Sequence, residues 1–582
     1  MSASQSFLCA PAYGYDVVVA ATQRSINATM KRFLLKVGQS ETVICYVVDK
    51  HGAPQQIDYE ELKNAADKAD PFKIPHGADP GANADLAKLI KVRFLFAIKA
   101  KIGVPPGYPH DAIPDIVTLG TDANVVTFRL MCSEFQIVEF TPGSIYRDAS
   151  FMNQSQPLGD AWMFTSTVAL RYIPYEPKYG ALPQDVQAST QGVSATDFSV
   201  QTLLLDLETA SLDSIPKISG LDPKSNLCAA LQNDFVDTYF ADMKKAGYPL
   251  LAVTVRHNDL PPSSMPISNV EFEVAPLVGG NGRPLPDPKP EQIGATTLNY
   301  LCMTAGHDPR PANAFNWNWL EPADISSFHG AISINRDRFA DYLDATLQQL
   351  VSRCCYTPLV RLDTDGLKIT YNVGLSNTPA PAPTRPAAGS TLLQYRQSAT
   401  AFDQAGVNGA LGQLRLSPSY SMDVSASGNV ITFTQRLVVY CVVRSLATEI
   451  ESNIVDRTLV DTYTLGVDGA GQLVTSLSST SRDDSQRLHV DNFVDFWTDI
   501  NQLEDGICNA VQGWTSPALS DIPLALMRGF VFPGGNTFAF KDAAFSDNQD
   551  LVAHITYLEP SPPENIAAMI AARKQKLRLA AE

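Results

Sequence analysis

One run of alternating residues constrains the fold more than any other part of the sequence. Between Val430 and Val443, apolar side chains recur with a period of two, at Ile431, Phe433, Leu437, Val439, Cys441 and Val443. A period of two is typical of a β-strand with one buried face. The run from Val430 to Val443 would reach roughly 50 Å, which is long for a strand. It therefore favours a tall, curved sheet over a compact sandwich.

Most of the remaining chain also has strand-like patterns. The clearest further segments are Asn124–Cys132, Ala161–Ile173, Leu250–Arg256, Ser268–Val278 and Leu551–Leu558. Turn residues separate such segments at Asp363–Gly366, Asp468–Gly471 and Asn281–Gly282. Two proline-rich stretches, Arg283–Pro290 and Asn377–Ser390, indicate loops, because proline removes a backbone donor.

Two segments have the spacing of an amphipathic helix. The first is Asp16–Val37, with Ile26, Met30, Phe33 and Leu34 on one face, Asp16 as a cap and Gly38 as a stop. The second is Ile334–Val351, with an apolar stripe formed by Phe339, Leu343, Leu347, Leu350 and Val351. The two stripes can be overlaid, which suggests two similar halves, although any two amphipathic helices share this pattern.

Composition and length bound the class of protein. The 582 residues suggest two to four domains. The formal net charge of -17 argues against nucleic-acid binding, which requires a basic face. No stretch has the length and apolar character of a membrane helix, and the first residues do not resemble a signal peptide. We therefore expect a protein that is cytoplasmic as synthesised, with later release or non-classical secretion as an alternative.

The sequence contains no recognisable catalytic or metal-binding pattern. No histidines have the His-x-x-x-His spacing, and no Gly-x-Ser-x-Gly motif occurs. Asp363–Gly366 begins like a calcium loop but lacks the later ligands, so a hairpin turn explains it better. The adjacent Cys354 and Cys355 suggest buried packing rather than redox chemistry, and His307–Asp308 lies in a proline-flanked loop. We expect a non-enzyme without a metal, nucleotide or other cofactor.

Three ordered segments resemble a known family. They are Tyr13–Ala20 followed by Ser25–Asn27, then Thr297–Leu301 with Phe315–Trp319, and finally Val531–Phe538 with Ser546–Leu551. Together they are similar to the opening, central and C-terminal signatures of the clostridial OrfX and forty-seven-kilodalton protein family. Members usually have Trp-Asp where this chain has Tyr15-Asp16, and this chain is longer, with a charged tail after Pro563.

The resemblance implies a fold and a function. The family is associated with the tubular lipid-binding (TULIP) superfamily, so the expected class is α+β, with elongated modules in which highly curved antiparallel sheets wrap long amphipathic helices. We expect an N-terminal module over residues 1–310, a C-terminal module over 311–562 and a helical tail over 563–582. Contact of that tail with a membrane surface is an alternative to a simple helix end with favourable charge.

The expected function is binding of a lipid or another hydrophobic ligand beside a toxin or its cluster proteins. An apolar groove suited to acyl chains would involve Ile26, Met30, Phe33, Leu34, Phe339, Leu343 and Leu347. In the alternative, helix and sheet close completely and these residues fill a dry core. The protein is then an interaction scaffold of a toxin complex without a ligand. For Trp317 and Trp319, packing is the expected role.

Overall fold

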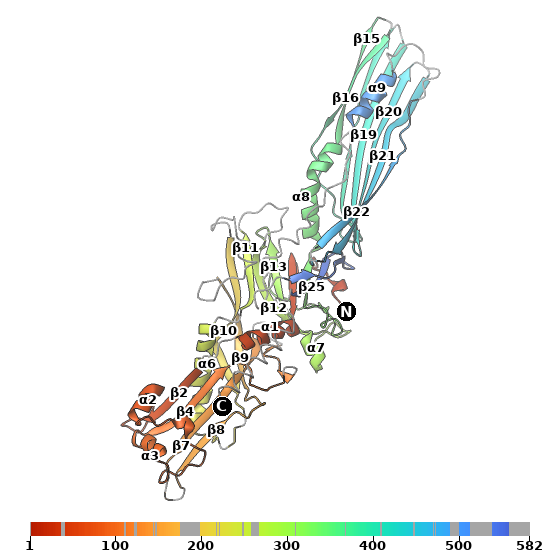
Figure 1. The fold of residues 1–582 in the computed structure, drawn as a ribbon. Coiled ribbons are helices and arrows are strands. Elements are labelled where there is room, and N and C mark those ends of the chain that lie inside the picture. The colour runs from red at the N-terminus through yellow and green to blue at the C-terminus, as the bar shows by residue number, and fades with distance from the viewer. Residues whose placement is uncertain are drawn as a thin grey trace.

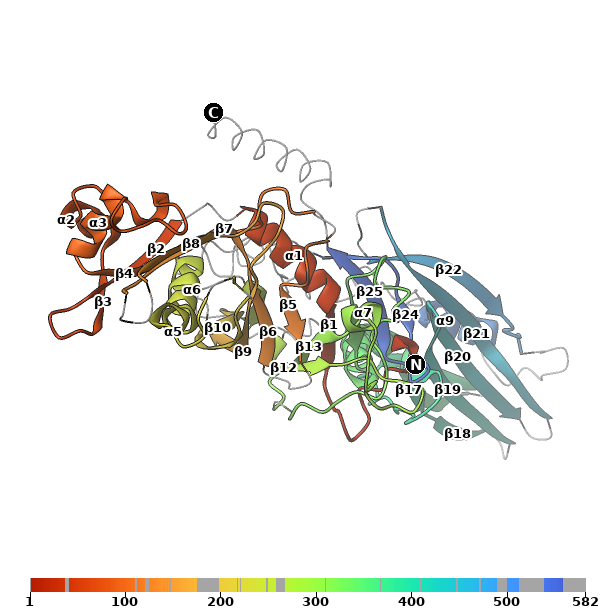
Figure 2. The same ribbon diagram turned by 90° about the horizontal axis from the view of Figure 1, so that it is seen from below.

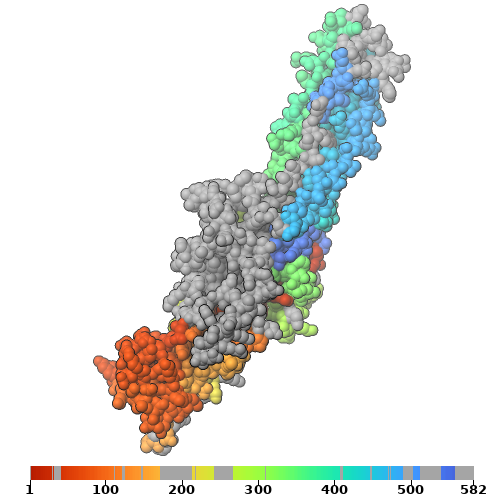
Figure 3. Space-filling view, in the orientation of Figure 1, coloured from red at the N-terminus to blue at the C-terminus, as the bar shows by residue number. Residues whose placement is uncertain are grey.

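The computed structural model describes most of the chain. The described residues are 2–36, 41–109, 112–120, 125–143, 145, 148–174, 198–216, 218–219, 221–246, 250–257, 267–308, 310–366, 368–407, 410–445, 448–469, 471, 473–488, 500–511 and 538–557. They form an extended molecule with a lobe at each end of a central sheet (Figure 1). The space-filling view shows the two lobes at opposite ends of its length (Figure 3).

The central sheet joins the two lobes. Its strands are antiparallel and follow the order β12-β13-β1-β14-β25-β23, with β24 paired to β25. Their bounds are β1 (Val17–Thr22), β12 (Ile267–Ala275), β13 (Thr297–Thr304), β14 (Gly330–Ile334), β23 (Phe538–Phe540), β24 (Ala544–Phe545) and β25 (Leu551–Tyr557). Strands therefore come from both sides of residue 310, so the division into modules 1–310 and 311–562 stays a prediction.

Strands β1, β13 and β14 are buried along their whole length. Val17 and Val19 belong to one apolar cluster, whereas Val18 and Ala20 belong to a second cluster on the opposite face. A strand covered on both faces has no polar alternation, which explains its continuous apolar sequence.

The prediction of a helix over Asp16–Val37 is wrong in its first third. Residues 17–22 form β1, and helix α1 (Gln23–Lys36) begins only afterwards. The β-branched valines of β1 fit a pleated strand that pairs with β13 on one side and β14 on the other. Asp16 is therefore not a helix cap, and Val37 and Gly38 lie outside the described residues.

The N-terminal lobe contains two five-stranded antiparallel sheets, in the orders β3-β2-β4-β7-β8 and β11-β10-β9-β6-β5. The first comprises β2 (Glu41–Val48), β3 (Pro54–Ile57), β4 (Phe94–Ile102), β7 (Cys132–Thr141) and β8 (Ser150–Ser155). The second comprises β5 (Val117–Leu119), β6 (Val125–Leu130), β9 (Phe164–Pro174), β10 (Phe198–Ser214) and β11 (Leu250–His257). The helices of this lobe are α2 (Tyr59–Ala65), η2 (Pro71–Lys73), α3 (Ala84–Lys91), α5 (Asn226–Gln232) and α6 (Asp234–Ala246). The short helices η1 (Ala3–Gln5) and α7 (Pro290–Gly294) lie beside the central sheet.

The C-terminal lobe is built on unusually long strands. Its main sheet has the order β17-β19-β20-β21-β22, with β18 paired to β19, and a hairpin of β15 and β16 packs beside it. The strands are β15 (Tyr356–Asp365), β16 (Lys368–Asn377), β17 (Thr391–Ser398), β18 (Ala401–Val407), β19 (Ala410–Ser427), β20 (Val430–Ser445), β21 (Thr448–Val467) and β22 (Leu473–Asp483). Figure 2 shows these strands extending away from the central sheet. The long strand predicted from Val430 is confirmed, because β20 has 16 residues.

Several other sequence predictions are confirmed. The five further strand segments correspond to β6 with the start of β7, then β9, β11, β12 and β25. Of the predicted turn Asp363–Gly366, the first three residues end β15, and Gly366 begins the connection to β16 with the positive φ of 59° that a tight turn needs. The second predicted helix corresponds to α8 (Arg336–Cys354), which starts after β14 rather than within it. The predicted tail over 563–582 lies outside the described residues.

Candidate functional site

Helix α8 places its apolar stripe inside the C-terminal lobe. The Asn335 side chain caps the helix by accepting from the Asp337 backbone N–H at 2.8 Å. Beyond this cap, Phe339, Leu343 and Leu347 are each 0% exposed. The helix contacts β17 and β16. The stripe that the sequence predicted is therefore the buried face of the helix.

The long strands present an apolar inner face that belongs to the same buried cluster as the α8 stripe. Its members on β19, β20 and β21 are Leu414, Leu416, Tyr420, Met422, Val424, Ile431, Phe433, Leu437, Val439, Cys441, Val443, Val455, Tyr463 and Leu465. Helix α9 (Ile500–Ala510) adds Leu503 and Ile507 near β16 and β21. The lobe thus has an apolar interior that follows the direction of its strands.

Helix α1 brings the other predicted site residues into the N-terminal lobe. Ile26, Met30 and Leu34 are at most 1% exposed, whereas the side chain of Phe33 lies outside the described part. Asn27 fixes this helix to β5, because its amide accepts from the Val117 N–H at 2.8 Å and donates to the Val117 carbonyl at 2.7 Å.

The six described candidate residues belong to one continuous apolar cluster but lie in two places. Those of α1 pack in the N-terminal lobe, and those of α8 pack in the C-terminal lobe. All six are shielded from solvent in this conformation. A ligand can reach them only where a helix and its sheet move apart.

The interior of the C-terminal lobe also contains polar side chains. The Tyr395 hydroxyl donates to the Asp344 carboxylate at 2.7 Å, and the Tyr420 hydroxyl donates to the Gln435 side-chain oxygen at 2.9 Å. Burial raises the pKa of both tyrosines, so both stay protonated and act as donors. Gln435 is not among the residues predicted from the sequence, although one polar residue between Phe433 and Leu437 in an alternating apolar row was a visible signal.

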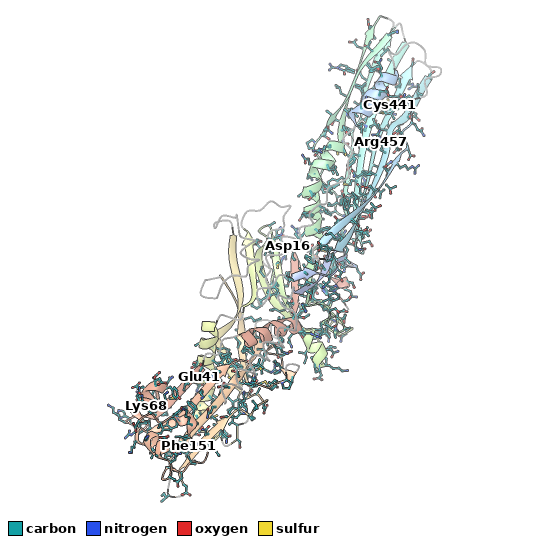
Figure 4. All side chains as sticks on the ribbon, viewed as in Figure 1. Asp16, Glu41, Lys68, Phe151, Cys441 and Arg457 are labelled. Atoms are coloured by element: carbon teal, nitrogen blue, oxygen red, sulfur yellow. The ribbon has the colours of Figure 1, made fainter. Side chains whose placement is uncertain are left out.

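A separate pocket of about 660 Å³ lies where α8 begins beside the central sheet. Asp16, which Figure 4 labels at this junction, is buried at its floor. The Asp16 carboxylate accepts from the Thr304 N–H at 2.7 Å and hydroxyl at 2.9 Å, and it lies 3.3 Å from Arg338 Nε. These contacts tie β1, β13 and α8 together at one point.

The chemistry of this pocket does not provide an activated nucleophile. His307 Nδ1 lies 2.7 Å from Asp16, not beside its sequence neighbour Asp308, and Arg338 Nη1 lies 3.3 Å from His307 Nε2. Both nitrogens of the imidazole therefore have partners. Burial, with the charges of Asp550 and Asp337, raises the pKa of the Cys9 thiol to about 11. That thiol stays protonated at neutral pH, so it is a poor nucleophile.

Other candidate reactive groups behave as core residues. Burial raises the pKa of Cys354 to about 11 and that of Cys355 to about 12, which agrees with the expected packing role. Trp317 and Trp319 are buried together with Tyr13, Tyr15 and Phe315 in one aromatic cluster. Among the described residues, no group of three or more His, Cys, Asp or Glu side chains could hold a metal ion. In the same residues, no helix combines the length and apolar character needed to cross a membrane.

Comparison with known proteins gives similarities at the level of structure. No protein-family model matches the sequence, and no curated protein matches it either. P47 from Clostridium botulinum A2 is 9% identical, with a TM-score of 0.39 over 93% of this chain and 97% of that one. P47 of Clostridium botulinum E1 is 9% identical, with a TM-score of 0.41 over 93% and 98%.

A lipopolysaccharide binding protein is 10% identical, with a TM-score of 0.28 over 94% of this chain and 100% of that one. The two P47 structures come from the family that the three sequence signatures resemble. At TM-scores below 0.5, these similarities establish no function for this chain.

Proposed function

We propose that this chain is a non-enzymatic protein that binds a lipid or another hydrophobic ligand. In this proposal, the two lobes are TULIP-like modules in which curved antiparallel sheets wrap amphipathic helices. The ligand contacts the apolar faces of those helices, at Ile26, Met30, Phe33 and Leu34 of α1 and at Phe339, Leu343 and Leu347 of α8.

The apolar interior of the C-terminal lobe is the observation that carries the proposal. The α8 stripe and the inner rows of β19, β20 and β21 belong to one apolar cluster. The 16 residues of β20 correspond to roughly 50 Å at the usual rise per residue. An elongated apolar interior of this kind suits a long acyl chain better than a compact ligand.

The proposed setting is that of an accessory protein in a toxin or toxin-like gene cluster. The support for this part is the three sequence signatures around Tyr15, Trp317 and Asp550. The proposed partners are other proteins encoded in such a cluster. A second proposed contact is that of residues 563–582 with a membrane surface.

One observation favours a second candidate function. The described stripe residues are at most 1% exposed, as expected for a closed core. A closed interior would leave the outer surface as the functional part, and the protein would then be an interaction scaffold without a ligand.

Native mass spectrometry of the full chain, followed by solvent extraction, separates the two candidates. The ligand-binding proposal expects an acyl-chain mass at a defined stoichiometry, either in the purified protein or after incubation with a mixed lipid extract. If the measured mass is that of the polypeptide without a ligand under both conditions, the ligand-binding proposal is contradicted and the scaffold is favoured.

A further inference from the structure

A single buried amide interrupts the apolar inner row of β20. Gln435 is 0% exposed and lies between Phe433 and Leu437 on the buried face of the strand. Its neighbours across the sheet are Met422 on β19 and Leu459 on β21, both of which are buried. An amide in such surroundings costs free energy unless its donors and acceptor are hydrogen-bonded.

A hydrogen bond from Tyr420 sets the orientation of this amide. Cys354, the last residue of α8, is hydrogen-bonded to Tyr420, and its raised pKa of about 11 keeps its thiol protonated. The Tyr420 oxygen can therefore accept from the thiol, while its O–H donates to Gln435 Oε1 at 2.9 Å. The side-chain oxygen of Gln435 faces Tyr420, and its Nε2 group points elsewhere.

The Nε2 donor is the part of Gln435 that lacks a partner. In the described part of the chain, no acceptor is hydrogen-bonded to it. The residues directly opposite Gln435 on the two adjacent strands, Met422 and Leu459, are apolar, whereas Asp461, opposite Phe433 on β21, brings a buried carboxylate to the same face. The donor is therefore suited to an acceptor atom carried by a mostly apolar molecule.

We propose that Gln435 binds the carbonyl oxygen of an acyl ester whose hydrocarbon chain lies along α8. This inference rests on the proposed function and names its ligand class. The donor is neutral, and the buried Asp461 on the same face is itself acidic, so a ligand carboxylate would be buried without a counter-ion there, whereas an ester carbonyl brings no charge. From Cys354 back to Phe339 the helix extends roughly 22 Å, a length comparable with an extended long-chain acyl group.

The test compares two ligands that differ only at the carbonyl. Monooleoylglycerol contains the ester, and its alkyl ether analogue has a methylene group in place of the carbonyl. Each competes with a neutral fluorescent acylglycerol for the parent chain and for Gln435→Met, which removes the donor but keeps a similar side-chain volume. Thr434→Val is the matched control, because Thr434 is on the same strand and exposed on its outer face.

The parent and Thr434→Val should bind the ester about tenfold more tightly than the ether, the value of one buried hydrogen bond. Gln435→Met should lose this preference and keep its affinity for the ether within about twofold. If Gln435→Met still prefers the ester, the proposed role of Gln435 is wrong. The same holds if the parent binds both ligands equally well. Neither result contradicts the proposed function. A parent that binds neither ligand overturns the proposed function as well.

Melting temperatures show whether the variants fold. Gln435→Met removes an unpaired buried donor but also takes the acceptor from the Tyr420 hydroxyl. These two effects oppose each other, so its melting temperature should lie within a few degrees of that of the parent. Gln435→Leu provides a second apolar replacement if methionine disturbs the packing, and the same loss of ester preference is expected. A rise in melting temperature with an unchanged ester preference would mean that Gln435 has only a structural effect, and would overturn the inference.

Discussion

The carboxylate of Asp16 lies 2.7 Å from Nδ1 of His307, which joins the start of β1 to the loop after β13. The same carboxylate accepts two hydrogen bonds from Thr304 and faces Arg338 at the first turn of α8. It is therefore one of the contacts that hold the central sheet against the start of α8.

Replacing Asp16 by alanine should destabilise the protein by about 2–4 kcal/mol, because the buried N–H and hydroxyl of Thr304 then lose their acceptor and Arg338 loses one ion pair while keeping that with Asp341. Chemical denaturation followed by tryptophan fluorescence measures this loss, and Asp308→Ala is the control because Asp308 is exposed. The control should change the free energy of unfolding by less than about 0.5 kcal/mol. Equal effects of the two substitutions would contradict the role of Asp16.

The pH dependence of stability should reflect two buried carboxyl groups. Burial raises the pKa of Glu273 to about 7 and that of Asp550 to about 6, above the values expected in the unfolded chain. A raised pKa in the folded state means that the folded protein binds protons more tightly. The contribution of these groups is therefore fully present below about pH 4 and is lost as the pH rises through 6 to 7.

Glu273→Gln isolates one of these contributions, since the amide keeps an acceptor for Asn299. Compared with the parent, this variant should lose less stability between pH 5.5 and pH 8, as measured by thermal melting at each pH. The same pH-dependent loss in the variant and the parent would show that Glu273 does not titrate as inferred.

The thiols at the end of α8 should be unreactive in the folded protein. Cys354 and Cys355 are buried and have pKa values of about 11 and 12, so they are protonated at pH 8. Iodoacetamide followed by peptide mass spectrometry should label them only after denaturation. Rapid labelling of either thiol in the native protein would contradict the packing role.

The strands were easier to predict than the helix boundaries. The run from Val430 alternates with a period of two because one face of β20 is buried, so its period identifies both the strand and the buried face. Residues Val17–Ala21 are buried on both faces, so a short apolar run replaces the alternation and fits a helix equally well. The error at Asp16 follows from that ambiguity, since an aspartate before an apolar run also matches a helix cap.

The candidate site could be predicted only in part. The apolar stripe of α8 follows from local spacing, and its residues are indeed buried. The contact of Asp16 with Arg338, and that of Tyr420 with Gln435, depends on how distant strands and helices meet. Local periodicity carries no information about such pairing. For the contact of Tyr420 with Gln435, the one signal in the sequence is the polar Gln435 in the apolar inner row of β20.

The central claim is that the interior beside α8 accepts a hydrophobic ligand, and Leu343 is the most direct place to test it. Fluorescent fatty-acid binding and unfolding free energy are measured together on the parent and on Leu343→Ala, with Met30→Ala as the corresponding change in α1.

If Leu343 contacts a ligand, the parent binds the probe saturably, and Leu343→Ala weakens binding about tenfold while losing less than about 2 kcal/mol of stability. If Leu343 fills a dry core, the same substitution costs about 2–5 kcal/mol. That destabilisation, together with no saturable binding by the parent, would contradict the account.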